Sequence, residues 1–170
     1  ADRNVGATAP EEYGLYFAWG DVVGYGQDTS DGHQFSWDNC PWGVNTPTMS
    51  TLDAEHDAAT VNMGVEWHMP DLEDFDELLD NCITEWTAQN GVKGLLFTSK
   101  VNGNTLFFPA DGYRFGSSLN HAGSYSIYWS RSLNASYGSN AVSLYLNSSD
   151  CNTNDNRRCC GYSVRGVRAK

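Results

Sequence analysis

The stretch that decides the fold is Ala141-Val-Ser-Leu-Tyr-Leu146, which follows Tyr125-Ser-Ile-Tyr-Trp-Ser-Arg-Ser-Leu133 after a short polar loop. Within it, Leu144 and Leu146 alternate with Ser143 and Tyr145. Successive side chains of a strand point to opposite faces, so the alternation predicts a strand with one face in the core and the other free to vary.

Strand signals continue on both sides of this pair. Gly94–Thr98 and Thr105–Pro109 flank Lys100–Asn104, whose Asn-Gly dipeptide predicts a hairpin turn. Tyr162–Arg168 predicts a final strand. The C-terminal part of the chain is therefore expected to be an array of antiparallel strands.

Helical signals lie earlier in the chain. Leu72–Ile83 places its apolar residues on one face at helical spacing, with Asp71 as a plausible cap. Asp53–Ala59 predicts a shorter helix that Asp53 caps, and Pro10–Gly14 suits one helical turn. Two main helices followed by a run of strands predict the α+β class, with much ordered loop.

Composition limits the class of protein. The 170 residues are enough for one domain with a core, spanning 1–170, and no apolar run approaches the ~20 residues of a membrane helix. The net charge is −11, and all acidic residues except Asp111, Asp150 and Asp155 precede residue 91. This charge argues against nucleic acid and anionic membranes as partners.

The five cysteines include the adjacent pair Cys159-Cys160. Their odd number and their spacing fit neither a disulfide framework nor a zinc site, so neither a metal nor a cofactor is expected. Cys82 falls at the end of a predicted helix and is expected to be a small buried hydrophobe.

The last quarter of the chain has an unusual composition. From Ser130 to Ala169 it contains no Lys, Glu, Gln, Met or Trp, the five residue types that no codon ending in C encodes. The types present are those that random replacement of the two adenines in the Asn codon AAC produces. Tyr, Ser, Gly, Asn and Arg are also the residues that binding loops use. A Ser/Asn-rich solvent surface is the simpler interpretation.

Several motifs in order carry a family resemblance: Asn4–Ala7, Pro10–Gly20, Trp67–Pro70, Asn90–Gly94, Phe108–Arg114, Tyr128–Ser130 and Ser163–Arg168. Together they resemble the C-type-lectin-fold domains of gut Bacteroidetes. Those domains are related to the formylglycine-generating enzyme (sulfatase-modifying factor) superfamily and to the Fibrobacter-type major paralogous domain. The C-terminal tract is similar to the variable region of proteins that retroelements diversify by adenine-specific errors.

The resemblance implies a fixed scaffold and a variable face within residues 127–162. It implies that Arg3–Ala7 lies near Val164–Arg168. The scaffold positions would be Trp129, Leu133, Ala141, Leu144, Leu146, Val164 and Val167. The positions expected to point outward and bind ligand are Ile127, Arg131, Asn134, Ser136, Tyr137, Ser139, Asn140, Val142, Ser143, Tyr145, Asn147, Asp150, Cys151, Asn152, Asn154, Asp155, Arg158, Cys159, Cys160 and Tyr162.

The function that the resemblance implies is that of a receptor or adhesin domain. Its partner would be a protein or cell-surface ligand, and its place extracellular, cell-surface or virion-associated. Tyr137, Tyr145 and Tyr162 would supply rigid aromatic contacts, and Arg131 and Arg158 would anchor acidic groups. The oligomeric state stays open. The alternative is an invariant pilus-tip or envelope module of the same fold, with a solvent-facing Asn/Ser surface.

Two chemical functions fit the sequence less well. Cys159-Cys160 lacks the spacing and surroundings of the cysteine pair that the superfamily's oxidase uses, and no nucleophile elbow is present, so we do not expect an enzyme. The motifs of calcium-dependent sugar-binding lectins are absent. A structural calcium ion in the acidic loop Asp21–Asp38 stays open.

Overall fold

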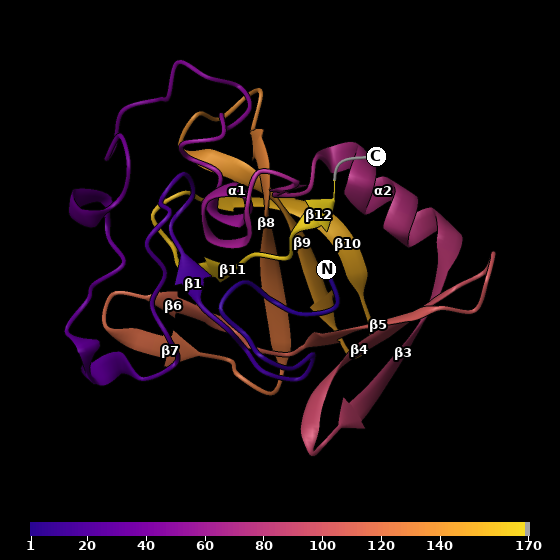
Figure 1. Ribbon diagram of the computed structural model, residues 1–170. Helices are drawn as coiled ribbons and strands as arrows, with labels where there is room; N and C mark the ends of the chain where they lie inside the picture. Colours follow the sequence, from indigo (N-terminus) through magenta and orange to yellow (C-terminus); the bar gives the residue numbers. More distant parts are fainter. Residues whose placement is uncertain (169–170) are drawn as a thin grey trace.

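The computed structural model describes residues 1–168 and is mostly β, with two short α-helices (Figure 1). Its largest sheet has the strand order β1-β11-β8-β9-β10. β8, β9 and β10 pair antiparallel, whereas β11 runs parallel to β8. The strands of this sheet are β1 (Tyr16–Phe17), β8 (Tyr125–Leu133), β9 (Asn140–Asn147), β10 (Cys151–Arg157) and β11 (Tyr162–Ser163).

Three smaller sheets complete the β structure. The expected hairpin is confirmed as part of a three-stranded sheet of order β3-β4-β5. The first strand of that sheet was not expected from the sequence. The strands of these sheets are β2 (Trp67–His68), β3 (Cys82–Gln89), β4 (Val92–Ser99), β5 (Thr105–Pro109), β6 (Tyr113–Phe115), β7 (Ser118–Asn120) and β12 (Val167–Arg168).

The expected long helix is confirmed as α2 (Leu72–Asn81), and it begins with a capping box in which the Asp71 N–H donates to Asp74 Oδ2 at 2.9 Å. It ends at Asn81, so Cys82 begins β3 rather than closing a helix, and its side chain is only partly buried.

The shorter expected helix is wrong in its position. α1 (Ala58–Met63) is capped by Asp57, whose Oδ1 accepts from the Thr60 N–H at 2.9 Å. Asp53 instead bonds the His56 ring at 2.7 Å. Pro10–Gly14 forms turns rather than a helix, and two 3₁₀ turns lie in the long loop, η1 (Thr29–Asp31) and η2 (Trp37–Asn39).

The two ends of the chain lie together, as expected. The Val5 N–H donates to the Val164 carbonyl at 2.9 Å, and the amino group of Ala1 donates to the Gly166 carbonyl at 2.7 Å. β1 pairs with β11, and β2 pairs with β12. The expected strand Tyr162–Arg168 is therefore two short strands that serve different partners.

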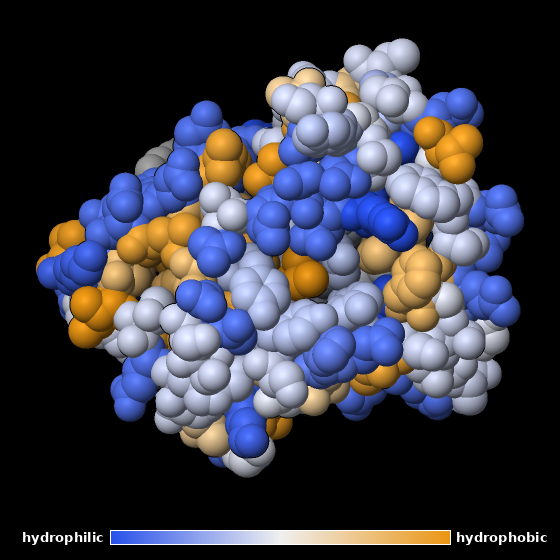
Figure 2. All heavy atoms as spheres, turned by 180° about the vertical axis from the view of Figure 1, so that it is seen from behind, coloured by the Kyte–Doolittle hydropathy of each residue, from blue (hydrophilic) through white to orange (hydrophobic). Residues whose placement is uncertain are grey.

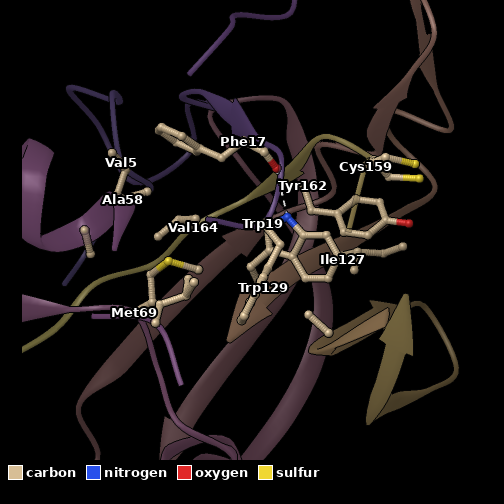
Figure 3. Packing of buried hydrophobic residues seen from close by; sticks show 14 residues of the cluster. Val5, Phe17, Trp19, Ala58, Met69, Ile127, Trp129, Cys159, Tyr162 and Val164 are labelled. Carbon is tan, nitrogen blue, oxygen red and sulfur yellow. Dashed lines mark hydrogen bonds between the residues drawn. The ribbon is translucent and has the colours of Figure 1, made fainter. Parts of the chain in front are cut away.

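The main sheet separates two apolar clusters. Trp19, Trp129 and Tyr162 pack together on one side, where the Trp129 indole donates to the Phe17 carbonyl at 2.8 Å (Figure 3). Phe75 of α2 packs with Tyr128 on the other side. Among the expected scaffold residues, Leu133 and Val167 are partly exposed, whereas five are buried: Trp129, Ala141, Leu144, Leu146 and Val164.

One face of the molecule is mostly polar. The face in Figure 2 shows small hydrophobic patches among hydrophilic side chains. Neither α-helix in residues 1–168 has the length and apolar character of a membrane span.

Candidate functional site

One face of the main sheet gathers tyrosine and asparagine side chains. The register places Tyr145 of β9 opposite Ile127 of β8 and Asn152 of β10. Side chains two residues apart share a face of a strand, which extends the row along all three strands. This tyrosine–asparagine face consists of Tyr125, Ile127, Tyr145, Asn147, Asn152, Asn154 and Asn156. The opposite face packs on the Phe75 cluster.

An aromatic pocket of about 330 Å³ adjoins this face. Its walls come from the main sheet, from β6 and from the segment between β10 and β11. The residues that line it are Tyr113, Phe115, Tyr125, Ile127, Asn156, Arg157, Cys160 and Tyr162. The pocket therefore lies at the border of the tract of unusual composition, which supplies four of its lining residues, whereas the other four precede the tract.

The tyrosines of the pocket pack on one another. The Tyr125 ring lies 4.7 Å from the His121 ring, 5.3 Å from the Tyr145 ring and 6.1 Å from the Tyr113 ring, measured between centroids. Tyr162 meets Tyr113 edge-on at 5.7 Å. These separations are those of favourable aromatic pairs, so the rings hold one another in place and present apolar faces with polar hydroxyl ends.

The electrostatics of the pocket are mild. Burial raises the pKa of Tyr125 and of Tyr162, so both hydroxyls stay neutral and can donate hydrogen bonds. Among its lining residues, Arg157 alone carries a permanent charge. Asn152 is exposed, and its side-chain amide forms no hydrogen bond to another group within residues 1–168. The surface suits a ligand with hydrogen-bonding or acidic groups and apolar faces.

The expected outward positions divide into three groups. Six are exposed: Ser136, Tyr137, Ser139, Asp150, Asn152 and Asn154. Eight are partly buried: Arg131, Asn134, Asn140, Val142, Tyr145, Asn147, Cys151 and Asp155. The expectation of outward side chains is wrong for six that are buried: Ile127, Ser143, Arg158, Cys159, Cys160 and Tyr162.

Arg158 departs furthest from its expected role as a ligand anchor. Its guanidinium is fully buried and donates to the carbonyls of Gly138, Pro41, Gly43 and Asn45 at 2.7, 3.2, 3.3 and 2.8 Å. The side chain therefore joins the long N-terminal loop to the turn before β9. It is unavailable to a ligand because its donors point into the protein.

Arg131 is also occupied within the protein. Its Nε and Nη2 donate to the two carboxylate oxygens of Asp71 at 2.8 and 2.6 Å. Hydrogen bonding from Arg131 lowers the pKa of Asp71, which keeps the pair ionised. Arg131 thus ties β8 to the start of α2 instead of anchoring a ligand.

Four other expected residues lie on the opposite face of the strands. By alternation, Asn140 and Val142 share the face of Leu144, and Cys151 and Asp155 lie beside them on β10. The Asn140 amide donates to Asp155 Oδ2 at 2.7 Å, and Cys151 packs on the Phe75 cluster, where burial raises its pKa to about 12. These residues do not share a surface with Tyr145.

The remaining buried positions have local causes. Ser143 lies opposite the buried Trp129, and its hydroxyl accepts a hydrogen bond from the side-chain amide of Asn156 at 2.8 Å. These two neighbours account for its burial. Ile127 and Tyr162 are nearly covered, yet both line the aromatic pocket. Alternation alone does not reveal that other segments of the chain cover part of this face.

Sequence reasoning missed several residues of the site. Tyr113, Phe115, Tyr125, Asn156 and Arg157 line the pocket but were absent from the expected set. The alternation of Asn152 and Asn154 continues to Asn156, a signal that could have found that residue. Tyr113 reaches the pocket because β6 packs against β11, and no pattern in the neighbouring sequence predicts that contact.

No group of three or more His, Cys, Asp or Glu side chains within residues 1–168 is arranged to hold a metal ion, and this range includes the acidic loop Asp21–Asp38. Comparison of the chain with protein-family models, with curated proteins and with solved structures finds no match.

Proposed function

We propose that this chain is a ligand-binding domain of a receptor or adhesin, with a C-type lectin fold and a surface that a retroelement diversifies. One observation carries the proposal. Tyr145, Asn147, Asn152 and Asn154, all of residue types that C-ending codons encode, gather on one open face beside an aromatic pocket.

The lectin-fold part of the proposal draws support from topology. Paired chain ends, two short helices and a main sheet with a parallel β11 agree with that scaffold. The sheet is held from behind by Phe75, Tyr128 and Leu144, all fully or nearly fully buried. A face backed in this way loses little conformational freedom on binding, which favours affinity.

The ligand would be a protein or cell-surface molecule. Tyr113, Tyr125 and Tyr145 offer large contact area with few rotatable bonds, and Asn152 offers both a donor and an acceptor. Arg157 at the pocket adds an anchor for an acidic or carbonyl group. Such surfaces concentrate binding energy in a few aromatic and Arg contacts.

An invariant adhesion or structural module is the second candidate. The observation that favours it is the burial of Ser143, Arg158, Cys159 and Cys160 inside the tract. Buried residues with specific bonds tolerate few replacements, so a diversified tract would have to spare them.

Deep sequencing of the 3′ end of the gene in one population separates the two candidates. Diversification predicts codon changes at Tyr137, Tyr145, Asn152 and Asn154, at sites where a nearby template copy has adenine, with Arg158 constant. An invariant 3′ end without a template copy would favour the fixed module instead. A binding screen with a surface-displayed pool of the variants then identifies the ligand.

A further inference from the structure

Cys159 and Cys160 occupy the turn between β10 and β11. The Cys160 N–H donates to the Arg157 carbonyl at 3.1 Å, which closes the turn. The Trp19 N–H donates to the Arg158 carbonyl at 3.0 Å and holds the turn against the N-terminal part of the chain. Both thiols are free, and their side chains are 1% and 6% exposed.

The two thiols interact with each other. Figure 3 shows the Cys159 sulfur beside a second sulfur of the cluster. A hydrogen bond from Cys160 lowers the pKa of Cys159, and the same bond raises the pKa of Cys160. Arg157 and Arg158 also favour a thiolate on Cys159. Cys160 additionally lines the aromatic pocket, so its sulfur is the one of the pair that is reachable from the surface through that pocket.

We propose that Cys159 and Cys160 form a vicinal dithiol site at the floor of the aromatic pocket, which small disulfide reagents oxidise to an internal disulfide. This site does not depend on whether the surrounding tract is diversified. Its chemistry comes from two adjacent sulfurs, one facing the pocket and one beside it.

The reaction is an ordinary thiol–disulfide exchange. Cys160 loses its proton to solvent and its sulfur attacks one sulfur of the reagent, whose S–S bond breaks and releases one thiolate. Cys159 then loses its proton to solvent, and its thiolate attacks the Cys160 sulfur and releases the second reagent thiolate; the two released thiolates take up the two protons. Two protein thiols are oxidised and one reagent disulfide is reduced to two thiols. Because the pKa of Cys160 is raised, the first step is expected to accelerate as the pH increases.

Closure of the disulfide would change the binding surface. The Tyr162 hydroxyl donates a hydrogen bond to the Cys160 sulfur in the reduced protein, and formation of a disulfide would draw that sulfur toward Cys159 and away from this contact. Tyr162 packs edge-on against Tyr113, so the oxidation state of the pair is coupled to the aromatic wall of the pocket.

Peptide mapping tests the site. The folded full chain is treated with hydroxyethyl disulfide, its remaining thiols are blocked with N-ethylmaleimide in denaturant, and it is digested with trypsin. The peptide from Cys159 to Arg165 is expected to be unblocked and lighter by two hydrogen atoms. In Cys160→Ser the same peptide should carry a blocked Cys159 or a mixed disulfide. Wild-type peptide blocked at both cysteines, or cross-linked to the peptide that contains Cys40, would overturn the proposal. Cys159→Ser is the second control: its remaining Cys160 should likewise be blocked or carry a mixed disulfide, because the internal disulfide cannot form.

Discussion

Arg158 shows how a charged side chain serves as a structural bridge. It is fully buried, its donors satisfy carbonyls of two separate loops, and its guanidinium lies 5.4 Å from the centre of the Trp37 ring. A buried charge is tolerated when it is fully hydrogen-bonded. Its neighbour Arg157 is exposed and lines the pocket, so two consecutive arginines have opposite roles.

Replacing Arg158 with Met is expected to lower the free energy of unfolding by about 3 kcal/mol or more, because several buried carbonyls lose their donors. Urea denaturation measures this change. Arg157→Met is the matched control and should change stability by no more than about 0.5 kcal/mol. Equal small losses in the two variants would contradict the structural role of Arg158.

The sequence alone does not indicate which of Arg157 and Arg158 is buried. Both follow a run of Asn, Thr and Asp in a tract whose composition indicates a surface. Burial of Arg158 depends on loop residues Pro41 to Asn45, which are more than a hundred positions away. Long-range contacts of this kind leave no periodic signal in the sequence. Six of the residues expected to be exposed are therefore buried in the structure.

Helix α2 is the element that sequence reasoning predicted best. Its apolar spacing, the preceding proline and the cap Asp71 are local signals, and local signals define α-helices well. β9 was likewise predicted from the alternation of its side chains, and a strand at β8 was also expected. β10 was not expected because Cys151–Arg157 contains almost no apolar residues, and its strand form depends on pairing with β9.

Removal of the helix cap tests the join between α2 and β8. Asp71→Ala is expected to cost about 1–2 kcal/mol of unfolding free energy, because the helix loses its N-cap carboxylate and Arg131 loses its partner. Asp76→Ala, on the exposed side of the same helix, should cost about 0.5 kcal/mol or less. Chemical denaturation of both variants under one set of conditions gives the comparison, and equal costs would mean that the cap contributes nothing.

Asp111 connects distant parts of the whole molecule. Its carboxylate is fully buried and accepts from Asn4 at 2.9 Å, from Ser163 at 2.6 Å and from Ser126. Arg165 donates to Asn4 Oδ1 at 2.9 Å, which brings both ends of the chain into the same network. Burial raises the pKa of Asp111 to about 7, although the two serines and Arg165 act in the opposite direction.

This raised pKa predicts a dependence of global stability on pH. The folded protein holds a proton that the unfolded chain, with an Asp pKa near 4, releases at lower pH. The contribution of Asp111 to stability is therefore complete below about pH 4 and is lost as the pH rises through about 7. The unfolding free energy of the wild type, relative to Asp111→Asn, should increase from about pH 8 to about pH 5. Parallel pH profiles of the two proteins would contradict this prediction.

The position of β10 at the edge of the main sheet bears on aggregation. An edge strand leaves backbone donors and acceptors unpaired, and proteins often guard such edges with lysine. The tract Ser130–Ala169 contains no lysine, so on β10 the polar side chains of Asn, Thr and Asp protect the edge instead. Diversification through C-ending codons would never introduce lysine but would introduce Ile, Val and Phe. The colloidal solubility of each variant, and not only its affinity, would then restrict which sequences persist in a population.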